Sequence, residues 1–314
     1  MVFANRRRGC ALAVVTFFRP RPIICAHEQH ARSREPTRRK PLAGSHTLQF
    51  LTEYRNPPTP TRTRMIQETL EIPAGDGVTE ALVVRPESTD PLPAIINLTD
   101  GLGFRPAFAE QSKRIAERGY VVLTPNIFYR VSKSPVFPFE PDFADERSRQ
   151  RFAELKAPMT TAAMERDGSA YVDFLLSQSY VNGAMGVIGF CFAGKFALLV
   201  AAMRPDRVAA AASFHGGGLF TDTIDSPHLV LPRVKARLYF GHATADQSMH
   251  TEAIEKLEWA LRSWGRDYES EMYDAKHGWM IPGGRVYDPP NAERGFEKLM
   301  QLFDDSLQSA EARR

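Results

Sequence analysis

The chain has 314 residues, of which 43% are hydrophobic and 25% are charged, as in ordinary globular proteins. Neither a membrane-crossing apolar stretch nor an internal repeat is present. The net charge is +3, but residues 1–64 contain 13 Lys and Arg and only 3 Asp and Glu, a balance of +10, which leaves −7 for residues 65–314. The basic character therefore gives no reason to expect that residues 65–314 bind nucleic acid.

The first 64 residues are rich in Arg and Pro and poor in acidic residues. Three arginines at 6–8 precede a short apolar run at 10–18, as in a secretory signal, but no clear cleavage site follows. An Arg-rich, acid-poor segment is also typical of an organelle presequence. We favour a third interpretation, in which translation starts at Met65. If residues 1–64 are translated, we expect them to form a basic, disordered extension.

From Met65 onward the chain alternates strand and helix patterns, after an opening pair of strands joined by a glycine-rich turn. The predicted strands cover residues 66–72, 79–85, 94–98, 120–124, 186–189, 208–214, 237–240 and 268–273. The predicted helices cover residues 108–118, 144–155, 161–178, 192–203, 252–264 and 291–307. This alternation predicts a single α/β domain over 65–314, with a mostly parallel central sheet and helices on both faces.

Cys191 stands where a strand pattern meets a helix pattern, in the segment MGVIGFCFAGKFALLVAAM. Small residues two positions away on each side, Gly189 and Ala193, are typical of a nucleophile elbow, in which a sharp turn carries the nucleophile. The start of the following helix favours a thiolate and an oxyanion. The alternative is a cysteine that is only a small core residue. A matching acid and histidine elsewhere in the chain argue against this alternative, because nucleophilic catalysis requires them.

In α/β-hydrolases the catalytic residues follow the order nucleophile, acid, histidine. Asp246 lies in a loop after the strand at 237–240, and His277 follows the strand at 268–273. These positions predict the triad Cys191, Asp246 and His277. The competing interpretations are an Asp246 that only starts a helix and a His277 that only belongs to a surface loop.

Five segments together resemble the dienelactone hydrolase family, the α/β-hydrolases with a Cys-Asp-His triad. They are NLTDGLGFRP, TPNIFYR, GFCFAG, GHATADQSM and KHGWM, in that order. The resemblance covers residues 65–314. It implies an α/β-hydrolase fold and a cofactor-independent hydrolysis of dienelactone to maleylacetate.

The expected chemistry is covalent. His277 would take the thiol proton and later protonate the leaving group, while Asp246 would hold its imidazole in the right tautomer. Developing negative charge on the carbonyl oxygen would be stabilised by backbone N–H groups of Phe192 and Gly101, the oxyanion hole.

Asp100 departs from the family pattern, which has a Glu at this position that pairs with the resting cysteine. The shorter Asp100 is expected either to modulate Cys191 as an acid or to turn the loop before Gly101. Arg130 matches the arginine that binds the substrate carboxylate in the family, with a solvated surface arginine as the alternative. The family's second arginine, after the histidine, is absent, and Arg285 is a candidate replacement.

Three functions are therefore kept open. The favoured one is hydrolysis of a lactone or enol ester that carries a carboxylate; the others are a broader carboxylesterase or thioesterase and a catalytically silent binding protein. We expect no cofactor and no metal, because the sequence has no metal or nucleotide motif. Cys191 is the one cysteine after residue 64, which suits a reducing compartment, so we expect a cytoplasmic monomer or small homo-oligomer without membrane or nucleic-acid partners.

Overall fold

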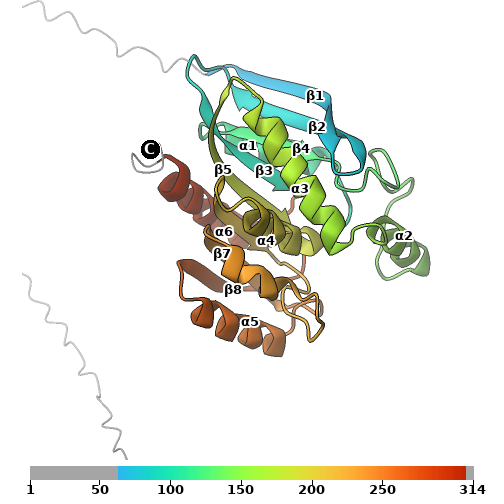
Figure 1. Ribbon diagram of the computed structural model, residues 1–314. Helices are drawn as coiled ribbons and strands as arrows, with labels where there is room; N and C mark the ends of the chain where they lie inside the picture. The colour runs from blue at the N-terminus through green and yellow to red at the C-terminus, as the bar shows by residue number, and fades with distance from the viewer. Residues whose placement is uncertain (1–62, 309–314) are drawn as a thin grey trace, which may run out of the picture. The chain divides into compact units, whose positions relative to one another are not determined.

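The computed structural model describes residues 63–308 (Figure 1), so nearly all of the extension predicted at 1–64 lies outside the described residues. An eight-stranded sheet has the strand order β1-β2-β4-β3-β5-β6-β7-β8. The strands are β1 (Met65–Ala74), β2 (Gly77–Pro86), β3 (Leu92–Leu98), β4 (Val121–Pro125), β5 (Val181–Phe190), β6 (Val208–Phe214), β7 (Arg237–Ala245) and β8 (Tyr268–Lys276). The helices are α1 (Pro106–Ala116), α2 (Glu146–Lys156), α3 (Thr161–Leu176), α4 (Gly194–Met203), α5 (Thr251–Trp264) and α6 (Pro289–Phe303). Shorter helical turns are η1 (Cys191–Ala193), η2 (Pro227–Arg233) and η3 (Asp304–Gln308).

The sheet is mostly parallel, as the sequence predicts. Strand β2 is antiparallel to both β1 and β4, whereas every pairing from β4 through β3 to β8 is parallel. Parallel strands have their carboxyl ends at one edge of the sheet, and open α/β sheets place their ligands there. The loops that follow β3, β5, β6, β7 and β8 therefore meet at a common edge.

Two apolar cores lie on opposite faces of the sheet. One joins the buried sides of α3, α4 and α5, and the other joins those of α1 and α6. Figure 1 shows α3 and α4 in front of the strands. Strands β3 and β4 are almost entirely buried because both of their faces are covered, which explains their continuous apolar sequences.

Several elements are longer or shorter than their patterns. Strand β7 continues to Ala245, one residue before Asp246, and the last helix ends at Phe303 before the π-helical turn η3. The proline-rich stretch 132–142 lies outside helices and strands, as predicted. These differences leave the predicted order of elements intact.

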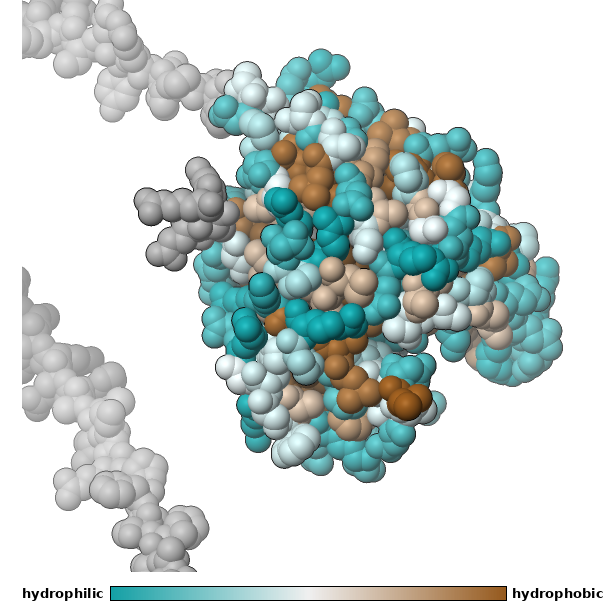
Figure 2. Space-filling view, viewed as in Figure 1, coloured by the Kyte–Doolittle hydropathy of each residue, from teal (hydrophilic) through white to brown (hydrophobic). Residues whose placement is uncertain are grey.

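The length and apolar character of the described helices bear on whether a segment could span a membrane. Within residues 63–308, no helix combines the length and apolar character needed to cross a bilayer. The face shown in Figure 2 mixes hydrophilic and apolar residues, with an apolar group at its lower right.

Candidate active site

The turn after β5 has the geometry of a nucleophile elbow. Cys191 has φ of 54°, a left-handed conformation that residues other than glycine rarely adopt. A Cβ on Gly189 would lie 2.0 Å from the carbonyl oxygen of Ala193, so any side chain at position 189 would clash with the turn. A Cβ on Gly194 would lie 2.2 Å from the Ser213 hydroxyl oxygen. The missing side chains let α4 approach β5 and β6 closely and keep the Cys191 sulfur at the edge of the sheet.

The structure brings Asp246 and His277 together. Asp246 follows β7 and His277 follows β8, and these neighbouring parallel strands end side by side. His277 Nδ1 lies 2.7 Å from Asp246 Oδ2. Burial alone would raise the pKa of Asp246, but hydrogen bonds from His277 and Ser248 outweigh it and lower that pKa. The carboxylate therefore stays charged beside the imidazole.

His277 also interacts with the Cys191 side chain, which contributes to the raised pKa of the imidazole. Since Asp246 binds Nδ1, the Nε2 atom is the one left for the sulfur. Burial disfavours the protonated imidazole, yet the hydrogen bond to Asp246 and the interaction with Cys191 outweigh it and raise the pKa of His277 to about 10. At neutral pH the arrangement therefore favours the protonated imidazolium form of His277.

Ser248 is part of this site, and sequence reasoning missed it. Its backbone N–H and its hydroxyl donate to Asp246 Oδ1, at 2.8 and 2.7 Å. The hydroxyl also lies 3.1 Å from His277 Nδ1. The spacing Asp-x-Ser in the loop is a signal for this turn, because Asp side chains often accept from the backbone N–H two residues on.

Replacing Ser248 with Ala is expected to lower kcat/KM for ester hydrolysis about tenfold, since Asp246 would lose one of the hydrogen bonds that fix its carboxylate. Steady-state kinetics would measure the change. Ser263→Ala, in an exposed position on α5, serves as the matched control. Equal activities of Ser248→Ala and the wild type would contradict a positioning role for the hydroxyl.

The loop after β3 places Asp100 against an arginine. Asp100 accepts two hydrogen bonds from Arg105, at 2.6 and 2.7 Å, and one from the backbone N–H of Leu102 at 3.0 Å. The structure therefore shows the loop-turning contact expected of Asp100, together with a bidentate ion pair that sequence reasoning missed. Modulation of Cys191 by Asp100 stays a prediction.

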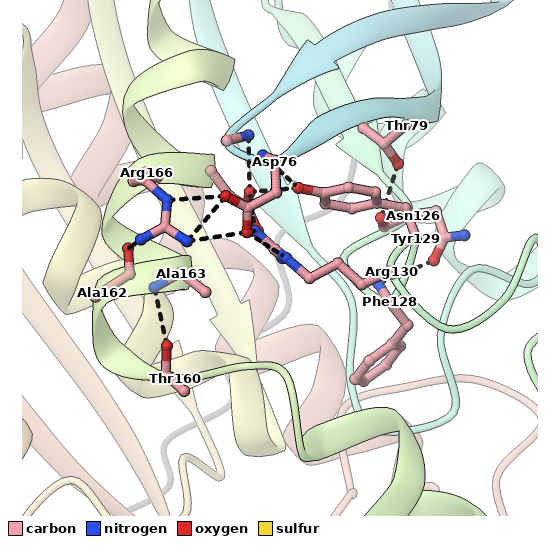
Figure 3. Close-up of polar contacts among 12 residues, drawn as sticks. Asp76, Thr79, Asn126, Phe128, Tyr129, Arg130, Thr160, Ala162, Ala163 and Arg166 are labelled. Carbon is pink, nitrogen blue, oxygen red and sulfur yellow. Dashed lines mark hydrogen bonds and ion pairs between the residues drawn. The ribbon is translucent and has the colours of Figure 1, made fainter.

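Arg130 lies in a network of ion pairs at the β1–β2 turn. Its guanidinium donates to both carboxylate oxygens of Asp167, at 2.6 and 2.8 Å, and to Asp76 at 2.8 Å. Figure 3 shows Asp76 between Arg130 and Arg166. Burial disfavours the charge of Arg130, but these hydrogen bonds outweigh it and raise its pKa. The structure thus gives Arg130 two carboxylates of this chain as partners, and its binding of a substrate carboxylate stays a prediction.

Other candidates from the sequence lie elsewhere. Arg285 is exposed and pairs with Asp142 at 2.6 Å. His215, at the end of β6, is fully buried, and its ring centroid lies 5.1 Å from that of His277. Burial, followed by the charge of His277, holds the pKa of His215 well below its usual value, so it stays neutral. The glycine run after it contacts the elbow, because Gly217 N–H donates to Cys191 O at 3.2 Å.

Two phenylalanine rings form a wall beside the predicted oxyanion donors. The Phe192 and Phe152 rings are perpendicular, with centroids 6.2 Å apart. Phe152 Cε2 lies 2.7 Å from the place that a Cβ on Gly101 would take. The Phe192 ring is therefore the side chain of one predicted oxyanion donor, and the Phe152 ring packs on the other donor, Gly101. Within residues 63–308, no cluster of three or more His, Cys, Asp or Glu side chains is arranged to hold a metal ion.

A mostly parallel sheet, an elbow after β5 and a histidine bound to an acid after β7 define an α/β-hydrolase. Solved structures agree on the fold. A structure from Klebsiella pneumoniae named "Putative Dienelactone Hydrolase" superposes with a TM-score of 0.68 at 20% identity, covering 76% of this chain and 98% of that one.

A model of the dienelactone hydrolase family matches residues 79–307. The chain belongs to the dienelactone hydrolase family. A Synechocystis protein named "Putative carboxymethylenebutenolidase" is 25% identical over 230 residues, 72% of this chain and 91% of that protein. A carboxymethylenebutenolidase from Pseudomonas putida is 28% identical over 155 residues, 49% of this chain and 63% of that one. The protein is therefore a hydrolase of ester or lactone bonds in small molecules, and the predicted family is confirmed.

Proposed function

We propose that this hydrolase opens a lactone or enol ester by covalent catalysis at Cys191. The observation that carries the proposal is the position of His277, whose imidazole is hydrogen-bonded to Asp246 and also interacts with the Cys191 side chain. Nucleophile, base and orienting acid are thereby in contact, as nucleophilic catalysis requires.

In the first half-reaction the Cys191 thiolate attacks the carbonyl carbon and forms a C–S bond. The backbone N–H groups of Phe192 and Gly101 stabilise the oxyanion. As the C–O bond to the leaving oxygen breaks, the His277 imidazolium gives that oxygen its proton. In a lactone the leaving group stays attached to the acyl chain, so the ring opens into an enol or alcohol on a thioester.

In the second half-reaction His277 takes a proton from water, which attacks the thioester carbonyl. The C–S bond breaks, the thiolate of Cys191 is restored beside the His277 imidazolium, and the carboxylic acid leaves and releases its proton to solvent. Asp246 keeps the imidazole oriented and stabilises its charged form throughout.

The substrate supported best is a dienelactone converted to maleylacetate. The names of the relatives support it, since carboxymethylenebutenolidase is a dienelactone-hydrolysing enzyme, as does the match of Arg130 to the family's carboxylate-binding arginine. The second candidate is a broader carboxylesterase or thioesterase. It is favoured by the ion pairs of Arg130 and Arg105, because each guanidinium already has a carboxylate of this chain as its partner.

Arg130→Met separates the two candidates. If Arg130 binds the substrate carboxylate, the ratio of kcat/KM for a dienelactone to that for a neutral aryl ester is expected to fall about tenfold, the value of one charge-assisted hydrogen bond. Because a ratio is independent of the amount of folded protein, lost stability does not affect it. An unchanged ratio would support the broader esterase.

A further inference from the structure

Two lysines lie against the aromatic wall formed by Phe192 and Phe152. The ammonium of Lys195, on α4, lies 4.7 Å from the centroid of the Phe192 ring. The ammonium of Lys156, at the end of α2, lies 5.3 Å from the centroid of the Phe152 ring. Since the two rings contact each other, both cations belong to one wall.

Two arginines at the predicted site are neutralised by carboxylates of this chain. Arg105 and Arg130 each form a bidentate ion pair with a carboxylate. Among residues 63–308, by contrast, neither Lys195 nor Lys156 forms an ion pair or a hydrogen bond with a side-chain acceptor. These two lysines are thus available to an incoming anion.

The charges around Lys195 are unfavourable for the protein alone. Its side chain is half-buried, and burial, followed by the positive charge of Lys156, lowers its pKa, with exposed Asp225 acting weakly in the other direction. Residues 65–314 carry a net charge of −7, so carboxylates are plentiful, yet no carboxylate within residues 63–308 forms an ion pair with these two ammonium groups. Unpaired like charges next to a candidate site are expected where a ligand supplies the counter-charge.

The place of the rings limits the shape of that ligand. Phe152 packs on Gly101, and Phe192 directly follows Cys191, so the wall starts at the predicted oxyanion hole. Each lysine ammonium lies over one of these two rings. A flat or apolar group lying on the rings would therefore separate the reacting carbonyl from the anion.

We propose that Lys195 and Lys156 form an anion subsite at the outer end of the aromatic wall, which selects esters or lactones whose carboxylate or phosphate is separated from the scissile carbonyl by an apolar segment. This inference rests on the proposed hydrolysis at Cys191. It assigns the anion to lysines from α2 and α4 and not to Arg130.

Matched substrates test the proposal. The 4-nitrophenyl monoester of adipic acid carries a carboxylate at the far end of its acyl chain, and 4-nitrophenyl hexanoate is a neutral ester of similar length. The 4-nitrophenyl ester of 5-phosphonopentanoic acid distinguishes a phosphate-type anion from a carboxylate. The measured quantity is kcat/KM for each anionic ester divided by kcat/KM for the neutral ester.

Lys195→Met keeps most of the apolar stem and removes the charge, which limits damage to the fold. The ratio is expected to fall about tenfold in Lys195→Met, because about one charge-assisted hydrogen bond to the anion is lost. It should fall further in the double variant with Lys156→Met. The fall should shrink with added salt because the subsite is partly exposed. Lys235→Met, an exposed lysine just before β7, is the matched control and should keep the wild-type ratio.

An unchanged ratio in the double variant, or the same fall in Lys235→Met, would overturn the proposal and leave the lysines as cover for the two rings. The pattern across the two anionic esters tells which anion the subsite prefers. For example, if the variants lower the ratio for the phosphonate ester and leave the ratio for the adipate ester unchanged, the substrate carries a phosphate-type anion.

A readout without turnover separates this proposal from the proposed function. Alkylation of Cys191 is followed by mass spectrometry, with 6-(iodoacetamido)hexanoate as the anionic reagent and its methyl ester as the neutral one. The lysine subsite predicts that the anionic reagent is favoured in the wild type and loses that advantage in the double variant. The proposed function fails and the subsite stands if no ester is hydrolysed, while the anionic reagent still reacts faster in the wild type and not in the double variant. Equal reaction of the wild type with both reagents would overturn the subsite.

Discussion

Cys191→Ala is expected to lower kcat for ester or lactone hydrolysis by at least about a thousandfold, because removal of a catalytic nucleophile leaves only binding and the oxyanion hole. Hydrolysis of a dienelactone and of a neutral aryl ester by the full chain would be measured side by side. Loss of activity on both would establish one thiol nucleophile for both substrates.

The same substitution has a readout that does not depend on turnover. The interaction with Cys191 helps to raise the pKa of His277 to about 10, so Cys191→Ala should lower that pKa. NMR titration of the His277 ring would follow the change, and circular dichroism would confirm that the variant is folded. A variant that keeps wild-type activity with an unchanged His277 pKa would contradict the proposed nucleophile.

Asp167→Ala is expected to lower the free energy of unfolding by about 3–5 kcal/mol, because it leaves the guanidinium of Arg130 without its main partner. The Asp167 carboxylate is completely buried, and it accepts hydrogen bonds from Arg130, from the Tyr129 hydroxyl and from the Gly75 backbone N–H. It thereby joins α3, the loop after β4 and the β1–β2 turn. Urea unfolding of the full chain would measure the loss.

Two variants control this result. Asp76→Asn removes the exposed partner of the same guanidinium, so water can replace much of the lost interaction and the loss should be far smaller. A double variant, Asp167→Leu with Arg130→Met, removes both buried charges and should recover much of the stability lost in Asp167→Ala. A double variant as unstable as Asp167→Ala would show that shape, and not the unpaired charge, causes the loss.

Local sequence was enough to predict the order of the elements and the elbow. Hydrophobic period and turn residues distinguish strands from helices, and the small residues Gly189 and Ala193 are required by the close packing of the turn at Cys191. The places of Asp246 and His277 also follow from chain order, because parallel strands end at one edge of the sheet. The sequence predicted the contact between them, and its role in catalysis stays a proposal.

The tertiary structure determines which charged side chains pair with one another. Arg130 and Asp167 are 37 residues apart, and nothing in the local sequence says that their elements pack together. One signal was present, since Asp167 lies among the buried residues of α3, where a charge requires a partner.

By itself, then, the sequence determined the α/β architecture, the family and the positions of Cys191, Asp246 and His277, because each depends on local patterns and on chain order. Only the folded structure decided that Arg130 and Arg105 are bound by carboxylates of the chain, while Lys195 and Lys156 have no carboxylate partner in the part of the chain that the structure describes. The physical reason is that an ion pair depends on distances of a few ångströms between segments far apart in the chain, and composition and spacing do not set those distances.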